Sequence, residues 1–562
     1  MDLIDYLEKL IWAKHDNGKN LLEKTTFNGI SYWWNIDYLF YNFLRLTTES
    51  KGAKFSITKR NALTTKLFGS QVGIYLFLLL EIVLFFFGKL LFLIELFRGK
   101  NKSENLKKKP SIIVISYDAA WVATPNYLYG LIKKSDHLKD SVMELLKDEV
   151  NFFGTSSFRY RISSFKIALE RVLFWEYSYS LLNANWTPKS WLNQKKAHRY
   201  FQKQWKTIEK DQSFKKLCNF DGMNLYLPII NEFKYYCYFL LPLCVSWVET
   251  FTTMIKKKKP SLVFLSNESG HSEKSLIIAA KKRQIPVLAM QHGVIVSTNR
   301  GYIYSEKDIH RDGSYKSPFN PIADKVAVFG TQYKDLLTEK GNFPQDSVVV
   351  TGNPKFDGLL QMVEQFKDRN QIRRWLRLPD DKPIVIWTTQ THWLSEEENR
   401  NNIDTVYSAL KELKSNFNLI VKLHPNEDQQ APLYKQDSAV NPIILGRGSE
   451  ILQLIYISDI LITKHSMTAT EAVALKKPVI ILNLSGNPDV IDCVDRGVAI
   501  GVYQKKDLSN AILRLLKDDK DLEFNRPDYI RSEFYQIDGK SSKRLANLIM
   551  EMIDTYTKSK HS

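Results

Sequence analysis

From residue 261 onward, short apolar runs alternate with helical stretches. The first runs lie at 261–266, 287–291, 325–330 and 347–352, and after Pro383 the pattern starts again with IVIWTT, LIVKL, IILG, DILIT and VIIL. Continuous β-branched runs separated by helices are typical of parallel strands that are covered on both faces. The sequence therefore predicts two doubly wound parallel sheets, with a hinge near 360–380.

The first sheet is expected to begin earlier, at the apolar stretch SIIVISYD that follows Pro110. Residues 126–258 are expected to form mainly long helices, one of them kinked at Pro242. The predicted fold class is thus α/β, with two Rossmann-like domains facing a cleft. The expected domains are a helical N-terminal region at 1–109, a first Rossmann-like domain with a helical insertion at 110–365, and a second at 366–562.

The segment 72–97 is the most apolar in the chain, and only Glu81, Lys89 and Glu95 interrupt it. On a helix these three charges fall within an arc of about 120°. Charges are costly at the centre of a bilayer, so the pattern predicts a helix in the membrane interface, or a re-entrant one, rather than a plain span. Basic residues on both sides would keep both ends on the cytoplasmic face of the cell membrane. The alternative is an unusually apolar core helix.

The net charge of +18, from 79 basic and 61 acidic residues, indicates an anionic partner. No nucleic-acid-binding motif is present, so the expected partner is an anionic membrane surface rather than a nucleic acid. The four cysteines have no CxxC spacing, which argues against a disulfide framework or a zinc site and favours a reducing compartment.

Polar residues follow the predicted strands, at the sheet edge where such folds bind ligands. In the first domain, Asp118, Glu268 and His292 follow successive strands, and in the second, Thr389, Lys422 and His424 do so. Side chains at these positions are expected to reach a ligand in the cleft between the domains.

The stretch TKHSMTATEA, at 463–472, ends one strand and opens a helix. Ser466 is the expected N-cap, and the helix N-terminus can bind a phosphate with help from the Thr468 hydroxyl. Lys422 and His424 would add positive charge, and Glu471, one turn along, could accept hydrogen bonds from ribose. The second domain is therefore expected to hold a nucleotide.

Residues 260–550 resemble nucleotide-sugar glycosyltransferases of the GT-B fold, in the motifs AMQHGV, VVVTGNPKFDGL, VKLHP, SDILITKHSMTATEAVALKKPVI and DGKSSKRLANLI. The resemblance is to capsule and surface-polysaccharide enzymes, to polysialyl- and Kdo-transferase-like proteins and to CDP-glycerol glycerophosphotransferases. It implies that His424 and Ser466 contact the donor phosphate, Glu471 the ribose, and that His292 lies in the acceptor half of the cleft. The sequence HSMT departs from the serine pair of many relatives, which leaves the donor open.

The expected function is transfer of a sugar from a nucleotide-sugar donor to a surface-polysaccharide or lipid-linked acceptor at the membrane. The acceptor hydroxyl then needs a general base, for which Asp118, Glu268 and His292 are the candidates. No DxD motif precedes a strand, so metal-independent transfer is expected, with no cofactor besides the nucleotide-sugar substrate. Three alternatives stay open: a CDP-polyol phosphotransferase, an enzyme like UDP-N-acetylglucosamine 2-epimerase, and a non-catalytic scaffold of polysaccharide assembly.

Overall fold

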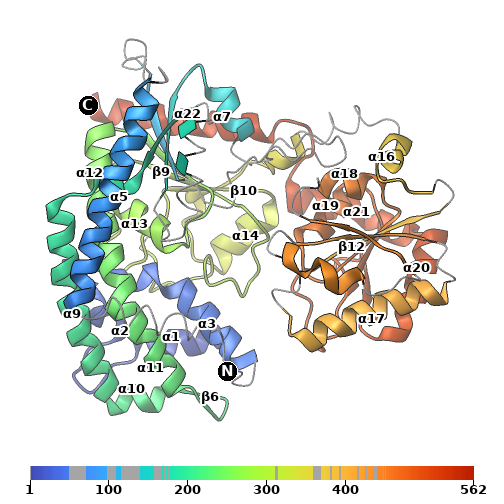
Figure 1. The fold of residues 1–562 in the computed structure, drawn as a ribbon, viewed down its shortest axis with the longest axis horizontal. Coiled ribbons are helices and arrows are strands. Elements are labelled where there is room, and N and C mark those ends of the chain that lie inside the picture. Colours follow the sequence, from blue (N-terminus) through green and yellow to red (C-terminus); the bar gives the residue numbers. More distant parts are fainter. Residues whose placement is uncertain are drawn as a thin grey trace.

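The computed structural model consists of two lobes that lie side by side (Figure 1). It describes residues 2–49, 71–97, 109–115, 140–156, 168–169, 172–173, 177–310, 314–357, 369–379, 382–390, 394–413, 417–424, 427–435, 440–446, 449 and 451–561. Asp118, one of the predicted general bases, lies outside these residues, as does the segment 358–368 of the predicted hinge.

Seven parallel strands form the sheet of the first lobe, in the order β11-β10-β9-β8-β3-β4-β5. Their bounds are β3 Ser111–Ile115, β4 Asn151–Ser156, β5 Ser178–Leu181, β8 Leu262–Leu265, β9 Val287–Met290, β10 Lys325–Val328 and β11 Val348–Val350. Alternate residues of β3 enter separate cores, Ile113 on one face of the sheet and Ile112 on the other. Both faces of the sheet are buried, as parallel strands require.

Two strands of this sheet, β4 and β5, lie within 126–258, where the sequence predicts mainly helices. Their sequences, NFFGTS and SYSL, contain no run of β-branched apolar residues. They form because β4 pairs in register with β3, and β5 with β4. Tertiary pairing therefore decides their conformation, and the prediction of helix was wrong there.

Six parallel strands form the sheet of the second lobe, in the order β14-β13-β12-β15-β16-β17. Their bounds are β12 Ile384–Thr388, β13 Asn418–Lys422, β14 Ile443–Leu445, β15 Ile460–Thr463, β16 Val479–Leu482 and β17 Ile500–Val502. The chain runs outward from β12 through β13 to β14, then returns to β15 on the other side. The strand order thus reverses at β12, and ligands of such sheets bind beside the carboxyl ends at this reversal.

Helices cover both sheets, which gives the GT-B-like α/β architecture that the sequence predicts (Figure 1). In the first lobe they are α7 Asp140–Leu146, α9 Pro188–Lys210, α10 Gln212–Leu217, α11 Tyr226–Tyr235, α12 Leu241–Lys258, α13 His271–Lys281 and α14 Thr331–Glu339. In the second they are α16 Arg369–Trp375, α17 Glu396–Glu412, α18 Ile451–Ile457, α19 Met467–Ala474, α20 Leu508–Lys517 and α21 Lys520–Phe534. A π-helical turn, Tyr236–Leu240, separates α11 from α12 just before Pro242, where the sequence predicts a kink.

The last helix, α22 (Ser541–His561), packs on the sheet of the first lobe, although its sequence follows the second. Leu545 and Ile549 enter the same core as Ile112 of β3. The carboxylate of Asp357, which follows β11, accepts hydrogen bonds from the backbone N–H groups of Ser541 and Ser542 at 2.9 and 2.5 Å. The predicted boundary of 366–562 placed this helix with the second sheet, but its apolar face is buried against the first.

The N-terminal region is part of the first lobe's core. It contains α1 (Leu3–Trp12), α2 (Leu21–Lys24), a short 3₁₀ turn at Tyr32–Asn35, α3 (Asp37–Glu49) and α5 (Gln71–Phe97). Two-stranded ribbons, β1 Thr26–Phe27 with β2 Ile30–Ser31 and β6 Asn219–Phe220 with β7 Met223–Asn224, complete the lobe. Trp33 is fully buried and stacks on Phe233 of α11.

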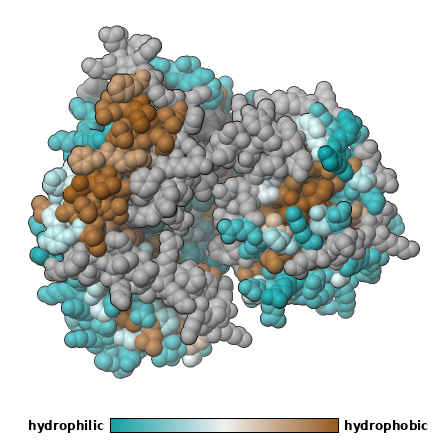
Figure 2. Space-filling model, viewed as in Figure 1, coloured by the Kyte–Doolittle hydropathy of each residue, from teal (hydrophilic) through white to brown (hydrophobic). Residues whose placement is uncertain are grey.

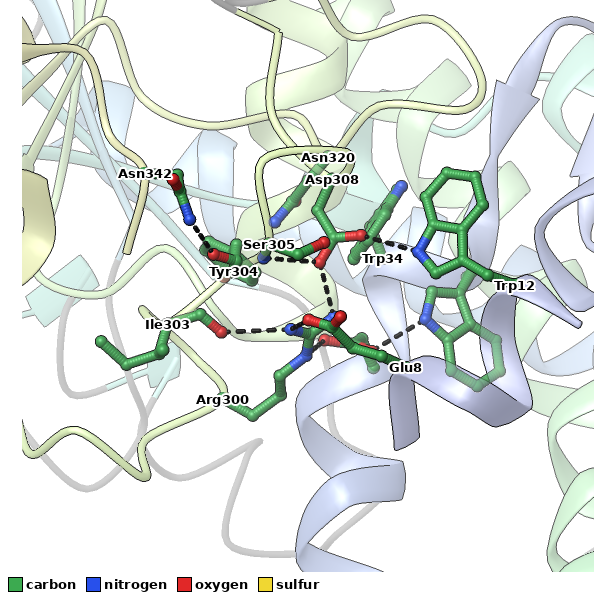
Figure 3. A network of polar contacts seen from close by, with 12 residues as sticks. Glu8, Trp12, Trp34, Arg300, Ile303, Tyr304, Ser305, Asp308, Asn320 and Asn342 are labelled. Carbon is green, nitrogen blue, oxygen red and sulfur yellow. Dashed lines mark hydrogen bonds and ion pairs between the residues drawn. The ribbon is translucent and has the colours of Figure 1, made fainter. Parts of the chain in front are cut away.

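Arg300 joins this region to the loop that follows β9 (Figure 3). Its guanidinium is fully buried and lies 3.0 Å from Asp37, 2.8 Å from Asp308 and 3.5 Å from Glu8. Burial by itself lowers the pKa of Arg300, but the Asp37 and Asp308 carboxylates outweigh it and raise the pKa, so Arg300 stays charged. Loss of Glu8 or Asp37 would leave part of the buried Arg300 charge uncompensated, which is costly in free energy. Because Glu8 lies on α1 and Asp37 on α3, these ion pairs hold both helices against the lobe.

Candidate functional site

Two threonines at the carboxyl end of β12, Thr388 as its last residue and Thr389 just after it, connect the strand ends of the second sheet. Oγ1 of Thr388 lies 2.9 Å from Oγ1 of Thr468, in the first turn of α19. Oγ1 of Thr389 accepts a hydrogen bond from the backbone N–H of His424, which follows β13, at 3.2 Å. The ends of β12 and β13 and the start of α19 therefore meet, at the reversal of the strand order.

Gln390 extends the same connection to the residues after β15. Its Oε1 accepts a hydrogen bond from the backbone N–H of His465 at 2.9 Å. Thr389 also donates to Oε2 of the buried Glu427 at 2.6 Å, which ties the loop after β13 to β12. We call this group of residues the second-sheet edge: Thr388, Thr389, Gln390, His424, Ser466 and Thr468.

The helix α19 begins at the second-sheet edge, and Ser466 is its N-cap, as predicted. Ser466 has an extended backbone, and its Oγ accepts a hydrogen bond from the N–H of Thr468 at 3.2 Å. Both side chains are half-buried, and a hydroxyl that accepts one bond can still donate another. The positive end of the helix dipole lies at the same place, so the edge is suited to binding a phosphate.

Lys422 lies at the end of β13 but is buried, and its Nζ donates to the carbonyl oxygen of Leu423 at 2.9 Å. His424 is half-buried, and its backbone carbonyl accepts from the N–H of Glu427 at 2.8 Å. The backbone of His424 is therefore held on both sides. Both predicted phosphate ligands meet Thr389 through their backbones: the carbonyl of Lys422 accepts from the N–H of Thr389 at 3.1 Å, and the N–H of His424 donates to Oγ1 of Thr389.

Glu471, the predicted ribose ligand, is paired with a residue of the other lobe. Its Oε1 lies 2.7 Å from Nζ of Lys355, in the TGNPKFD segment after β11. The Glu471 carboxylate is buried, and its Oε2 has no hydrogen-bond partner among the described residues. One carboxylate oxygen thus binds a cation across the lobes, while the other is enclosed and could accept from a ligand hydroxyl only if the atoms around it moved.

His292 lies in the exposed loop after β9, close to where the lobes meet. Gln291 fixes the start of this loop: its Oε1 accepts from the N–H of Phe329 and its Nε2 donates to the carbonyl of Gly293, both at 2.8 Å. Val294 packs against the core of the second lobe, and Met467, the first residue of α19, packs against the core of the first.

Glu268, another predicted general base, lies in the interior of the first lobe. It is fully buried, and its Oε2 accepts a hydrogen bond from the N–H of Ala323 at 3.0 Å. Burial raises the pKa of Glu268, and the nearby charge of Lys274 opposes this effect. A general base must touch the acceptor, so the buried position of Glu268 favours a structural role.

Sequence reasoning left three contributors to the site without a role: Lys355, Gln390 and Glu427. Lys355 and Gln390 lie in strand-end segments, which is the signal that could have drawn attention to them. Glu427 carries no such signal, because only the folded loop brings it to Thr389. Within the described parts of the chain, no group of three or more His, Cys, Asp or Glu residues is placed to hold a metal ion.

These features define a two-lobed α/β protein whose second lobe has a strand-end cluster suited to binding a phosphate. Residues 254–551 match the family model described as CDP-Glycerol:Poly(glycerophosphate) glycerophosphotransferase. That range is more than half of the chain, and the chain belongs to this family. The match includes every residue of the second-sheet edge, together with Lys355, Glu471 and His292.

A curated relative and two solved structures are also similar to the chain. UDP-N-acetylglucosamine 2-epimerase of Neisseria meningitidis serogroup A is 28% identical over 154 residues, which are 26% of this chain and 41% of that enzyme. The crystal structure of UDP-GlcNAc 2-epimerase from Neisseria meningitidis bound to UDP-GlcNAc overlaps with a TM-score of 0.47 at 16% identity, covering 78% of this chain and 99% of that one. A structure of the wall teichoic acid polymerase TagF overlaps with a TM-score of 0.45 at 12% identity, covering 82% of this chain and 95% of that one. Both TM-scores lie below 0.5, so neither structure informs the function of this chain.

Proposed function

We propose that this protein transfers a polyol-phosphate group from a cytidine-diphosphate-linked donor to a hydroxyl of a polymeric or lipid-linked acceptor. The observation that carries the proposal is the second-sheet edge, where Thr389, His424 and Thr468 meet at the N-terminus of α19. Membership of the family supports a phosphate-linked group rather than a sugar. The sequence alone favoured sugar transfer, with the phosphotransferase as an alternative, and the family reverses that order.

In the proposed reaction, the acceptor hydroxyl oxygen forms a bond to the donor phosphorus that carries the polyol. The bond from that phosphorus to the bridging oxygen breaks, and cytidine monophosphate leaves with the bonding electron pair. The N-terminus of α19 and the hydroxyls of Ser466 and Thr468 would stabilise the negative charge on the leaving phosphate. Glu471 would accept from the ribose through Oε2.

The proton of the acceptor hydroxyl must go to a base. His292 is the remaining described candidate, because it is exposed on the loop that lies beside the second lobe. An imidazole can take a proton from a hydroxyl within hydrogen-bond reach. In this proposal the first lobe therefore supplies the base and binds the acceptor, while the second lobe binds the donor.

A second candidate is chemistry on a uridine-diphosphate-linked sugar. The similarity to a UDP-N-acetylglucosamine 2-epimerase favours it, although the match spans 41% of that enzyme. Both candidates need a nucleotide phosphate at the second-sheet edge, but the nucleobase of the donor is cytosine in the first and uracil in the second. The choice of nucleotide therefore separates them.

A thermal-shift panel with CMP, CDP, UDP, GDP and ADP on the purified protein tests the proposal. We expect CDP and CMP to raise the melting temperature, because a ligand that binds the folded state stabilises it by mass action. CDP-glycerol, incubated with a poly(glycerophosphate) acceptor, should release CMP. A shift with UDP alone would move the second candidate to the front. No shift with any nucleotide would overturn both and favour the non-catalytic scaffold.

The variant Ser466→Ala tests whether the nucleotide binds at the N-terminus of α19, and Thr187→Ala is its matched control. Thr187 is the N-cap of α9 in the first lobe and accepts from the N–H of Ser190 at 3.2 Å, the same distance as in the Ser466 cap. Each variant loses a cap worth about 1 kcal/mol, so both should melt earlier without ligand. Only Ser466→Ala should lose the shift that CDP causes.

A further inference from the structure

The helix α5 packs on the first lobe along its whole length. Its buried positions recur every three or four residues, so they form one continuous face of the helix. These positions are Gly73, Phe77, Glu81, Leu84, Gly88, Leu91 and Glu95. At Gly88 the approach is so close that an added Cβ would lie 2.8 Å from Cβ of Ala184.

Both acidic residues of α5 point into the lobe. Oε2 of Glu81 accepts a hydrogen bond from Nδ2 of Asn183 at 2.8 Å. Oε1 of Glu95 accepts from the backbone N–H of Tyr179, in the edge strand β5, at 2.8 Å. The two carboxylates, which are the groups least suited to lipid, are thereby buried in protein and hydrogen-bonded.

The opposite face of α5 is apolar and exposed, and Figure 2 shows it as a hydrophobic area along the course of this helix. Its large apolar residues are Tyr75, Leu76, Leu79, Val83, Phe86, Leu90, Leu93, Leu96 and Phe97. Phe86 is 64% exposed and Leu79 is 59% exposed, although both are fully apolar side chains. We call these nine residues the outer face of α5. A contiguous apolar face of this kind marks an interaction site.

Basic residues lie beside the outer face near its first residue and again partway along it. Nζ of Lys195, on α9, lies 3.2 Å from the hydroxyl of Tyr75 and over the ring of Trp191. Further along α5, Lys89 is exposed, and burial and the charge of Lys89 lower the pKa of Lys257. α9 itself carries seven Lys and Arg residues and one Glu. An apolar face bordered by cations and aromatic rings is complementary to an anionic bilayer surface.

The neighbours of α5 rule out a transmembrane orientation. α5 rests on β5, the edge strand of a seven-stranded sheet, and Glu95 bonds a backbone N–H of that strand. If α5 crossed the hydrocarbon core, β5 would enter it too, and open sheet edges do not occur there. Among the described residues, a second long apolar stretch runs from Tyr226 to Lys258, and 72% of its most apolar 18-residue window is buried within the protein, as expected of core helices.

We propose that α5 lies in the plane of an anionic lipid bilayer, with its outer face in the lipid and Glu81 and Glu95 turned towards the protein. This surface would hold the first lobe, and so the acceptor side of the proposed site, at the membrane. The proposal does not depend on the proposed chemistry, because lipid binding can be measured without donor or acceptor.

The first test is flotation of the full chain with vesicles of phosphatidylcholine and phosphatidylglycerol at 3:1, compared with phosphatidylcholine alone. The variant Leu79→Glu/Phe86→Glu/Leu93→Glu places three charges on the outer face. The matched control, Leu227→Glu/Leu513→Glu/Phe524→Glu, places three on exposed apolar residues of α11, α20 and α21. We expect the first to lower vesicle binding by about tenfold or more and the control to leave it within about twofold. Equal melting temperatures of the two variants would show that both are folded.

The second test measures how deep α5 lies in the bilayer. The four native cysteines are buried, so single cysteines introduced at Leu79, Phe86 or Leu93 can be labelled with a fluorophore. Quenching by lipids with nitroxides at two depths should place all three labels at the same shallow level. A span would separate the labels at 79 and 93 by roughly 20 Å along the membrane normal, at about 1.5 Å per residue.

Three results would overturn the proposal. One is a graded depth across the three labels, which would indicate a span. Another is vesicle binding that the outer-face variant leaves unchanged. The third is a dimer in light scattering that this variant dissociates, with no vesicle binding by the native chain, which would assign the outer face to a second copy of the protein.

Discussion

Glu471 and Lys355 come from different lobes and meet at a distance of 2.7 Å. A carboxylate as buried as that of Glu471 needs a charged or hydrogen-bonding partner, and Lys355 supplies one. Oε2 of Glu471 is enclosed and has no hydrogen-bond partner among the described residues. At the residue scale, Lys355 is therefore best described as a positioning residue for Glu471.

Glu533 is a second acid at the contact between the lobes. It lies on α21, is buried, and accepts a hydrogen bond from the hydroxyl of Tyr333 on α14. Burial, helped by Asp492, raises the pKa of Glu533 to about 8, against the opposing effects of the Tyr333 hydrogen bond and of Arg496. Glu533 is thus protonated in the folded state at pH values where it is ionised in the unfolded chain.

We expect stability to depend on pH through Glu533. Since the folded state holds a proton that the unfolded chain has lost, its contribution is complete below about pH 4.5, falls as the pH rises and is lost above about pH 8. Between pH 5.5 and 8.5, native protein should lose at least about 1 kcal/mol more than Glu533→Gln, which cannot ionise. Urea unfolding at both pH values measures this. The control is Glu523→Gln, at an exposed site on the same helix, which should lose as much stability between the two pH values as the native chain. An equal change in unfolding free energy for all three proteins would contradict the raised pKa of Glu533.

At the scale of elements, the segment after β11 and the start of α22 hold each other in place. Arg544 of α22 donates to the carbonyl of Thr351 at 2.8 Å, and Asp357 caps the helix. Gly352 has φ +85°, and an added Cβ would lie 2.4 Å from Oγ of Ser541, so glycine is needed there. The sequence motifs TGNPKFD and DGKSSKRLANLI are therefore two halves of one structural joint.

Asp357→Ala should destabilise this joint by about 1–2 kcal/mol, because the first N–H groups of α22 lose a charged acceptor. Differential scanning calorimetry measures the loss. The control is Asp346→Ala, an exposed acid of the same lobe, which should change the melting temperature little. A loss no larger than that of the control would show that Asp357 does not hold α22.

The sequence could predict most of the two sheets because strands such as β8 and β12 are continuous apolar runs that are buried on both faces. It could not predict β4 or β5, whose mixed sequences become strands by pairing. In the site, strand-end reasoning found Thr389, His424 and Ser466, which the fold brings together locally. It could not pair Glu471 with Lys355 or place α22 on the first sheet, because those contacts join segments more than a hundred residues apart.

At the scale of the whole molecule, each lobe supplies a different part of the proposed site. The second sheet offers the proposed phosphate site at the second-sheet edge, and the first lobe offers His292 and the outer face of α5. Lys355 with Glu471 and Tyr333 with Glu533 connect the lobes between these surfaces. A donor bound at the second-sheet edge would therefore lie close to the loop of His292.

Hydrogen exchange with and without saturating CDP tests the central claim, that the second-sheet edge binds the donor nucleotide. We expect slower exchange in peptides that cover 463–474, 388–390 and 422–424, and no change in β4 or β5. The same protection should fail in Ser466→Ala and persist in Thr187→Ala. Protection confined to the first lobe, or none at a CDP concentration that saturates the thermal shift, would contradict the claim.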